Sequence, residues 1–211
     1  MAKTKLVCFD LDHTLIIDIH SVMFLSKINN NFSKLIEIEK QEKAGVFDWI
    51  EADHYKAKLA KGIHINEIKN DFDKHIKPIN KIKETIGVLN KMDIATILIT
   101  AGPKQVAKIA SEKWKIDDFH GSDYEVKDKV FTGKILDHIG DKGKVSFLKS
   151  YCQENDFFPE ECIAIGDGAS DIPLFDYCGT SIAINYSENV IGKATYYLET
   201  TDLSEILKYI N

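Results

Sequence analysis

The spacing of apolar residues changes from a strand pattern to a helix pattern near the start of the chain. The run from Leu6 to Phe9 is short, apolar and rich in residues that favour strands. From there to Pro78 the apolar residues recur at intervals of three and four, as in Ile65, Ile68 and Phe72. This spacing predicts several helices and no strand between the first strand and Pro78.

Beyond Pro78 the two patterns alternate. The chain repeatedly passes from a helical stretch to a short apolar run, with a hairpin expected over Ser122–Ile135. Helices are expected over Ile79–Met92, Pro103–Trp114, Lys144–Asn155 and Leu203–Ile210, and strands over Ala95–Thr100, Cys162–Asp167, Ser181–Ile184 and Tyr196–Leu198. Such alternation indicates an α/β fold, a Rossmann-like doubly wound parallel sheet with helices on both faces. We expect a core of residues 1–15 and 79–211 and a helical cap inserted at 16–78.

Composition and charge narrow the classes of function. With 211 residues, 44% of them hydrophobic, the chain has room for one core and a smaller inserted unit. The net charge of −6 and the lack of a basic block argue against a nucleic-acid partner. All 27 basic side chains counted as lysine or arginine are lysines. This matters because arginine is the usual bidentate clamp for carboxylates.

Cysteine usage and the lack of targeting segments predict where the protein works. The four cysteines have no metal-site or C-x-x-C spacing, so buried free thiols are expected at Cys8, Cys152, Cys162 and Cys178. No secretory leader pattern opens the chain, and no apolar run approaches the roughly 20 residues of a membrane span. We therefore expect a cytoplasmic protein without a membrane partner.

Two aspartates follow the first strand. Asp10 and Asp12 are one residue apart, and side chains at this spacing point the same way along a strand. Two crowded carboxylates repel each other unless a proton or cation lies between them. Hard oxygen ligands of this kind suit Mg²⁺, which also takes phosphate oxygens. Taken alone, the pair is also consistent with a solvated acidic turn.

Further polar residues end other predicted strands. Asp10, Thr100 and Asp167 each lie at the carboxyl end of an apolar strand. In parallel sheets these ends meet at one edge, where the ligand crevice lies. We therefore expect the three side chains to converge, with the helical insertion placed to cover them.

This convergence has a defined chemistry. Asp10 is the candidate nucleophile for attack on phosphorus, and Asp12 the candidate general acid and base. Thr100, with the chain at Ala101 and Gly102, offers a hydroxyl and close backbone approach to a phosphate. Lys144 offers a positive charge to a phosphoryl oxygen and to Asp10, with Lys142 as its rival.

The same edge supplies a metal site. Asp10, Asp12 and Asp167 are the candidate Mg²⁺ ligands. Asp171, four residues after Asp167, is expected to orient a metal-bound water or hold the lysine. Charge concentrated in this way is what phosphate monoester hydrolysis requires.

The motifs together resemble a known family. Asp10-Leu11-Asp12-His13-Thr14, Thr100, Lys144 and Gly166-Asp167-Gly168-Ala169-Ser170-Asp171 resemble the four motifs of the haloacid-dehalogenase superfamily of phosphohydrolases. The resemblance covers nearly the whole core, including Phe131-Thr132-Gly133. The helical insertion after the first motif is similar to that of the subclass containing phosphoserine phosphatase. The resemblance implies Mg²⁺-dependent hydrolysis of a small phosphomonoester through an aspartyl-phosphate on Asp10.

Departures from the phosphoserine phosphatase pattern affect the expected substrate. Within the stretch 16–20 an isoleucine, with Asp18 beside it, stands where that subclass has a substrate-binding glutamate. The chain has no arginine for the substrate carboxylate, and Ser170 replaces a common asparagine. Asp18 with Lys56 or Lys58 is a conceivable replacement clamp. We expect phosphoserine not to be the best substrate. Candidate contacts from the insertion are Phe47, Trp49, His54, Tyr55, Lys56 and Lys58.

Three alternatives to this hypothesis share part of its pattern. A signalling receiver domain also combines acidic residues with a threonine and a lysine, but it is shorter and lacks both the Gly-Asp-Gly-x-x-Asp element and the insertion. Phosphoserine phosphatase proper and a phosphotransferase with the same site stay open. The oligomeric state is not indicated by the sequence.

Overall fold

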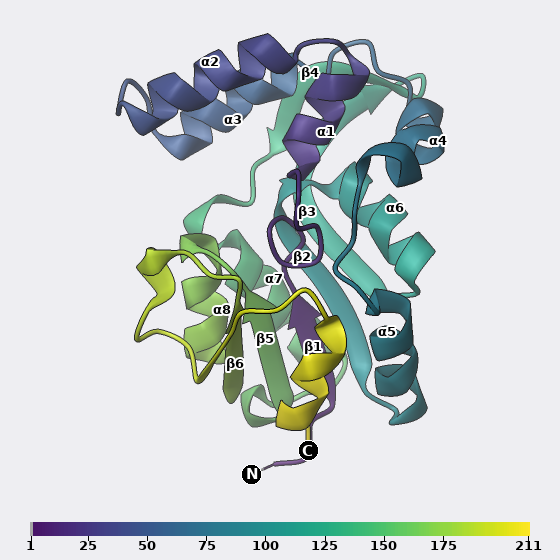
Figure 1. Cartoon of the computed structure of the whole chain (residues 1–211), viewed down its shortest axis with the longest axis vertical. Helices are drawn as coiled ribbons and strands as arrows, with labels where there is room; N and C mark the ends of the chain where they lie inside the picture. The colour runs from purple at the N-terminus through teal and green to yellow at the C-terminus, as the bar shows by residue number, and fades with distance from the viewer. Residues whose placement is uncertain (1) are drawn as a thin grey trace.

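A seven-stranded sheet lies at the centre of the core, in the order β4-β3-β2-β1-β5-β6-β7 (Figure 1). The computed structural model describes residues 2–211, apart from the side chain at position 141. All neighbouring strands are parallel except β3 and β4, which form the hairpin. The strands are β1 Leu6–Phe9, β2 Ala95–Pro103, β3 Asp118–Lys127, β4 Val130–Asp137, β5 Cys162–Gly166, β6 Thr180–Ile184 and β7 Tyr196–Leu198.

Alternate side chains of the strands pack against helices on opposite faces of the sheet. Val7 and Phe9 belong to the core formed with α5, α6 and the C-terminal 3-10 helix. Leu6 and Cys8 belong to the core formed with α7 and α8. The predicted doubly wound α/β sheet is therefore confirmed. The helices are α5 Ile82–Lys91, α6 Lys104–Trp114, α7 Gly140–Glu154, α8 Ile172–Tyr177 and the 3-10 helix Leu203–Tyr209.

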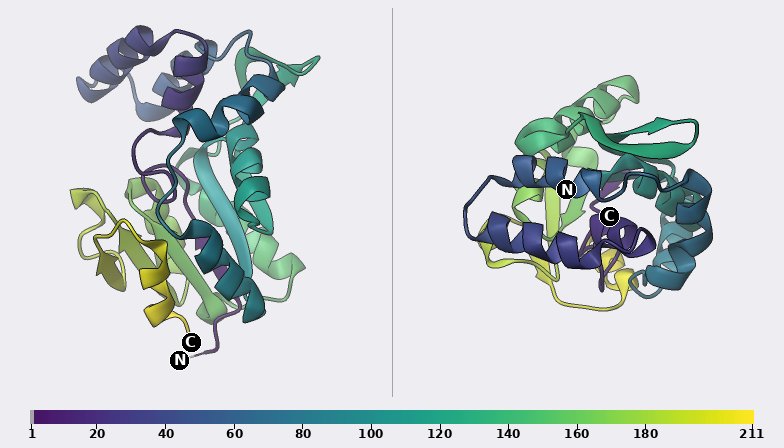
Figure 2. Two further views of the ribbon diagram at one scale, coloured as in Figure 1. Left: turned by 45° about the vertical axis from the view of Figure 1, so that its right-hand side comes forward. Right: turned by 90° about the horizontal axis from the view of Figure 1, so that it is seen from above.

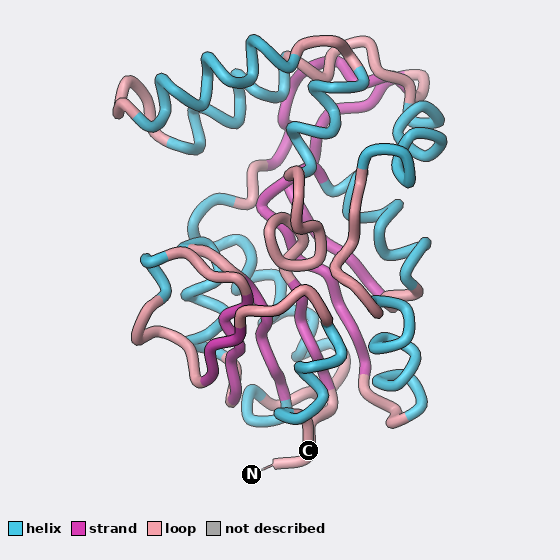
Figure 3. Tube along the Cα trace, in the orientation of Figure 1, coloured by secondary structure: helices cyan, strands magenta, loops and turns pink. Residues whose placement is uncertain are grey.

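The segment after β1 forms four further helices at one end of the molecule, next to β4 (Figures 1 and 2). They are α1 Ser21–Ile28, α2 Phe32–Lys43, α3 Trp49–Lys58 and α4 Ile65–His75. Figure 3 shows the two non-helical connections at the ends of this segment, one from β1 to α1 and one from α4 to α5. They run side by side, and Ile79 N–H donates to Leu15 O between them at 2.9 Å. We retain residues 16–78 as a proposed cap unit on this basis.

The hairpin joins the insertion through backbone hydrogen bonds. Gly62 N–H donates to Phe131 O and Phe131 N–H donates to Ile63 O, both at 2.9 Å, and Ile65 N–H donates to Lys129 O at 2.8 Å. The turn residues Asp128 and Lys129 both have positive φ, as a two-residue hairpin turn requires. The β3–β4 hairpin, although close in sequence to core strands, therefore packs on the insertion.

Two elements differ from the sequence expectation. α7 begins at Gly140, one turn before Lys144, although glycine is a poor helix former. Gly143 allows the Ile139 side chain to pack closely, because a Cβ there would lie 2.5 Å from Ile139 Cγ1. The last element is a 3-10 helix in which Leu203 and Ile206 are both fully buried, a spacing that suits three residues per turn.

All four cysteines are buried free thiols, as expected. Within residues 2–211, none of the helices combines the length and apolarity needed to cross a bilayer.

Candidate active site

The central strands bring the predicted polar residues together. β1 lies between β2 and β5, so the residues that end these strands are neighbours. Asp10 N–H donates to Ile165 O at 2.8 Å, which extends the β1–β5 pairing to the aspartate itself. Asp10 and Thr100 are buried and Asp167 is half-buried, at the carboxyl edge where crevices form in parallel sheets.

Lys144 connects this edge to α7. Its Nζ lies 2.5 Å from Asp10 Oδ1 and 2.7 Å from Asp171 Oδ1, and its side chain is only 2% exposed. Lys142, the rival, is exposed to solvent. A lysine buried between two carboxylates is held in one position, because each of its contacts is a charge-assisted hydrogen bond. The structure therefore places Lys144, not Lys142, beside Asp10.

Asp171 is positioned by the loop after β5. Its Oδ2 accepts hydrogen bonds from the backbone N–H groups of Asp167 and Gly168, each at 3.1 Å, while Oδ1 accepts from Lys144. Gly166 makes room for this carboxylate, since a Cβ there would lie 2.3 Å from Asp171 Cγ. Both oxygens of Asp171 are thus engaged, which fits the expected role of holding the lysine.

Asp12 makes a contact that the sequence did not predict. Its Oδ1 accepts from Ser21 N–H and its Oδ2 from Ser21 Oγ, both at 2.6 Å. Ser21 is the first residue of α1, so this pair fixes the start of the insertion over the strand ends. A Cβ on Gly102 would lie 2.4 Å from Ser21 Oγ and 3.0 Å from Asp12 Oδ2, which explains the glycine.

The last residues of β2 lie beside this pair. The strand continues to Pro103, three residues past its predicted end at Thr100. Thr100 Oγ1 accepts from Gly102 N–H at 3.0 Å, and Ala101 O accepts from Ser122 Oγ at 2.7 Å. The predicted phosphate-contacting segment, Thr100 to Gly102, is therefore held in a fixed backbone conformation at the end of β2, next to Asp12.

The pKa values of the charged residues at this edge are shifted. Burial, opposed by Lys144, raises the pKa of Asp10 well above its usual range. Burial and then the charge of Asp171 raise the pKa of Asp167 to about 7. Burial alone would lower the pKa of Lys144, but the carboxylates of Asp10 and Asp171 raise it above its ordinary value. The lysine is therefore charged at neutral pH, and it balances only part of the negative charge.

A divalent cation fits this charge distribution. Carboxylate oxygens of Asp10, Asp167 and Asp171 lie within 4.8 Å of one another, the only such group of His, Cys, Asp and Glu residues found in residues 2–211. Both oxygens of Asp171 already accept hydrogen bonds, whereas Asp10 and Asp167 each keep at least one carboxylate oxygen without a donor, which suits a hard cation. Asp12, predicted as a third ligand, lies outside the group, with its carboxylate bound to Ser21.

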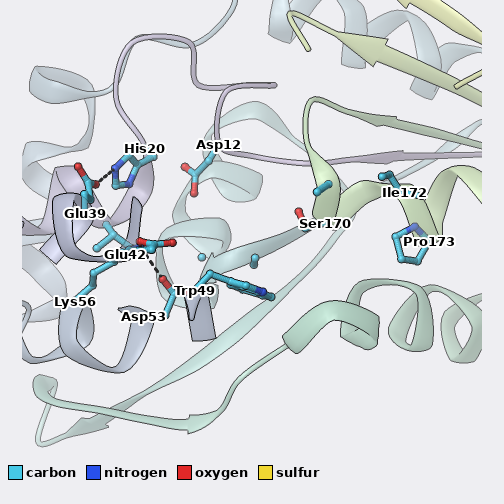
Figure 4. Close-up of a pocket in the computed structure, with 14 residues that line it drawn as sticks. Asp12, His20, Glu39, Glu42, Trp49, Asp53, Lys56, Ser170, Ile172 and Pro173 are labelled. Atoms are coloured by element: carbon cyan, nitrogen blue, oxygen red, sulfur yellow. Dashed lines mark hydrogen bonds and ion pairs between the residues drawn. The ribbon is translucent and has the colours of Figure 1, made fainter. Parts of the chain in front are cut away.

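A cavity of about 680 Å³ opens between the strand ends and the insertion (Figure 4). Asp12, Ala101, Gly102 and Ser170 line it from the core. Residues of the insertion line the opposite side, and two of them, Trp49 and Lys56, are predicted contacts. The full set from the insertion is His20, Val22, Glu39, Glu42, Trp49, Asp53 and Lys56.

The other insertion candidates lie elsewhere. Phe47 and Lys58 pack on the ring of Tyr55, and His54 contacts the ring of His138. Asp18 is exposed, and its carboxylate accepts from the adjacent Ile19 N–H. Neither Asp18 nor Lys58 lines the cavity.

Comparisons with known proteins identify the family of the chain. The family model described as haloacid dehalogenase-like hydrolase matches residues 7–176. The chain belongs to this family. The phosphoserine phosphatase of Methanocaldococcus jannaschii is 26% identical over 209 residues, covering 99% of this chain and 98% of that protein. The phosphoserine phosphatase of Idiomarina loihiensis is 28% identical over 207 residues, covering 97% and 93%.

A solved structure of a phospho-aspartyl intermediate analogue of phosphoserine phosphatase is also similar, with a TM-score of 0.84, 26% identity and full coverage of both chains. The predicted superfamily, fold and enzyme class, a phosphoric monoester hydrolase, are confirmed.

Proposed function

We propose that this hydrolase is a Mg²⁺-dependent phosphatase of small phosphomonoesters that forms an aspartyl-phosphate on Asp10. The observation that carries the proposal is the buried arrangement of Lys144 between Asp10 and Asp171 at the strand ends. The lysine contacts one oxygen of Asp10 and leaves the other free to attack phosphorus.

The reaction divides into two displacements. The free oxygen of Asp10 forms a bond to phosphorus while the bond from phosphorus to the ester oxygen breaks. Asp12, held at the cavity by Ser21, gives the departing oxygen a proton. A water oxygen then forms a bond to phosphorus while the bond from Asp10 to phosphorus breaks. Asp12 takes the water's proton, Asp10 returns to a carboxylate, and inorganic phosphate leaves.

The surrounding groups stabilise the transferred phosphoryl group. The positive charge of Lys144 and the backbone and hydroxyl donors at Thr100, Ala101 and Gly102 are assigned to its oxygens. Mg²⁺ held by Asp167 and by the oxygen of Asp10 that does not attack would supply further positive charge to the transferred group. Asp171 acts through Lys144, which it holds in place.

A small molecule is the partner that fits the cavity, and relatives named phosphoserine phosphatase support a phosphomonoester. Phosphoserine itself stays an alternative, as does a phosphotransferase that passes the phosphoryl group to another alcohol. We propose a cytoplasmic location, where four buried thiols stay reduced.

The test is turnover of a phosphomonoester panel with Mg²⁺, using the full-length protein and Asp10→Asn. The variant keeps the shape of the side chain but removes the nucleophilic charge, so turnover should fall below detection. Beryllium fluoride should bind the unmodified protein and not Asp10→Asn. Substantial turnover by the variant would refute Asp10 as nucleophile, and a new phosphate ester formed from added alcohols would favour the phosphotransferase.

A further inference from the structure

The wall that the insertion contributes to the cavity is acidic. Glu39 and Glu42 from α2 and Asp53 from α3, here called the acidic wall, face the cavity with a single lysine, Lys56. Figure 4 shows these four side chains gathered on one side of the cavity, with Ser170 on the other. Three carboxylates against one ammonium leave this wall negatively charged.

The neighbouring histidines do not remove this charge. The Nε2 of His20 lies 2.9 Å from Glu39, and the Nε2 of His138 lies 3.0 Å from Asp53. In each ring Nδ1 accepts a backbone N–H, from the first turn of α1 and of α7 respectively. A neutral imidazole with its proton on Nε2 therefore satisfies both contacts of each ring. The hydrogen bond from His20 lowers the pKa of Glu39, so this carboxylate is ionised at neutral pH.

Lys56 is already engaged by two carboxylates. Its Nζ lies 2.7 Å from Glu42 Oε2 and 3.2 Å from Asp53 Oδ1, and its side chain is 12% exposed. A carboxylate on a substrate would have to displace one of these partners and would then face the remaining negative charges. The lysine therefore neutralises part of the wall and does not offer a free anion site.

We infer that the leaving group of the substrate carries an amine or quaternary ammonium and no carboxylate. This inference rests on the proposed function, because the cavity that holds the leaving group is the one beside Asp12. Glu42 and Glu39 are the carboxylates best placed to meet the cation, since they are 27% and 29% exposed and have one partner each, whereas Asp53 is 15% exposed and has two. Trp49 lines the same cavity and supplies an aromatic ring, a surface to which ammonium groups bind.

Substrates that differ only in the end group test this inference. The full-length protein with Mg²⁺ is assayed on 2-aminoethyl phosphate, choline phosphate, 2-hydroxyethyl phosphate, phosphoglycolate and phosphoserine. The kcat/KM of at least one of the two cationic esters should exceed that of the hydroxyethyl ester by about tenfold, the effect of roughly 1.4 kcal/mol. Phosphoserine should rank below the better cationic ester, and phosphoglycolate last.

A variant pair ties the preference to the acidic wall. Glu42→Gln should reduce the ratio of kcat/KM for the better cationic ester to that for the hydroxyethyl ester by about tenfold. Glu37→Gln is the matched control, because Glu37 is exposed on the same helix and does not line the cavity, and its ratio should not change. Should Glu42→Gln fail to fold after losing the Lys56 contact, Glu39→Gln is expected to reduce the same ratio.

The outcomes separate this inference from the proposed function. The inference is overturned if the kcat/KM of the hydroxyethyl ester, phosphoglycolate or phosphoserine equals or exceeds that of both cationic esters. The phosphatase assignment stands in that case, because the esters are still hydrolysed. An unchanged ratio in the Glu42 and Glu39 variants also overturns it. Lack of hydrolysis of every ester, including p-nitrophenyl phosphate, overturns both.

Discussion

Replacing Lys144 by methionine tests the centre of the site. Methionine retains most of the length of the side chain and removes its charge. The change leaves Asp10 and Asp171, both buried, without the ammonium group that each contacts. Asp167, which is not saturated by donors, adds to the uncompensated negative charge.

The expected loss of stability in Lys144→Met follows from this burial. Removing one partner of a buried ion pair costs about 3–5 kcal/mol, and for a chain of this size the melting temperature should fall by about 6–20 °C. Turnover should fall by about 10²–10³, as it does when one charge-stabilising donor is lost. Lys142→Met is the matched control. Its exposed side chain predicts a stability change within about 0.5 kcal/mol.

Thermal unfolding and steady-state turnover of both variants, with and without Mg²⁺, measure these effects. The destabilisation of Lys144→Met should shrink as the pH falls toward 5, because protonation relieves the unpaired carboxylates. A larger loss in Lys142→Met than in Lys144→Met, or a Lys144→Met enzyme within threefold of the parent in turnover, would refute the assigned role.

Three further predictions concern the loop after β5. Asp167→Asn should raise the Mg²⁺ concentration for half-maximal rate, with part of the rate recovered at high Mg²⁺; an unchanged titration would contradict a ligand role. Because the pKa of Asp167 is raised to about 7, its folded form binds the proton more tightly than its unfolded form. The free energy of unfolding of the metal-free protein should therefore fall as pH rises from about 4 to about 7. The Mg²⁺ affinity measured by calorimetry should weaken below pH 7. A change in the opposite direction in either quantity would refute this. Gly166→Ala should displace Asp171 and cost about 1–3 kcal/mol and most activity. Gly87→Ala, with open space around it, should do neither; equal effects in these two variants would refute the packing argument.

The strand ends could be predicted from sequence because they depend on local pattern and on one topological rule. Asp10, Thr100 and Asp167 each follow an apolar run, and parallel pairing brings such residues to one edge. Lys144 was identified from a motif, and its burial between Asp10 and Asp171 follows from the path of α7.

The insertion side of the site could not be predicted in the same way. Glu39, Glu42 and Asp53 belong to amphipathic helices, where an acidic residue usually indicates a solvated face. Whether such a residue faces water or a cavity depends on how α2 and α3 pack over the strand ends, which local periodicity does not determine. The Ser21–Asp12 pair depends on the same packing, since it joins α1 to the loop after β1.

The backbone hydrogen bonds between the hairpin and the insertion have a mechanical consequence. If the helices swing away from the strand ends to admit substrate, Phe131 and Lys129 must travel with them, because these residues bond to the α3–α4 connection and the start of α4. The moving body then includes β4 and the outer half of β3, beyond the irregular pairing with β2 that follows His120. β4 ends at Asp137 and α7 begins at Gly140, so this rigid-body rotation would reach the first turn of the helix that carries Lys144. Admission of substrate would thus also move the chain segment that leads into the helix carrying Lys144.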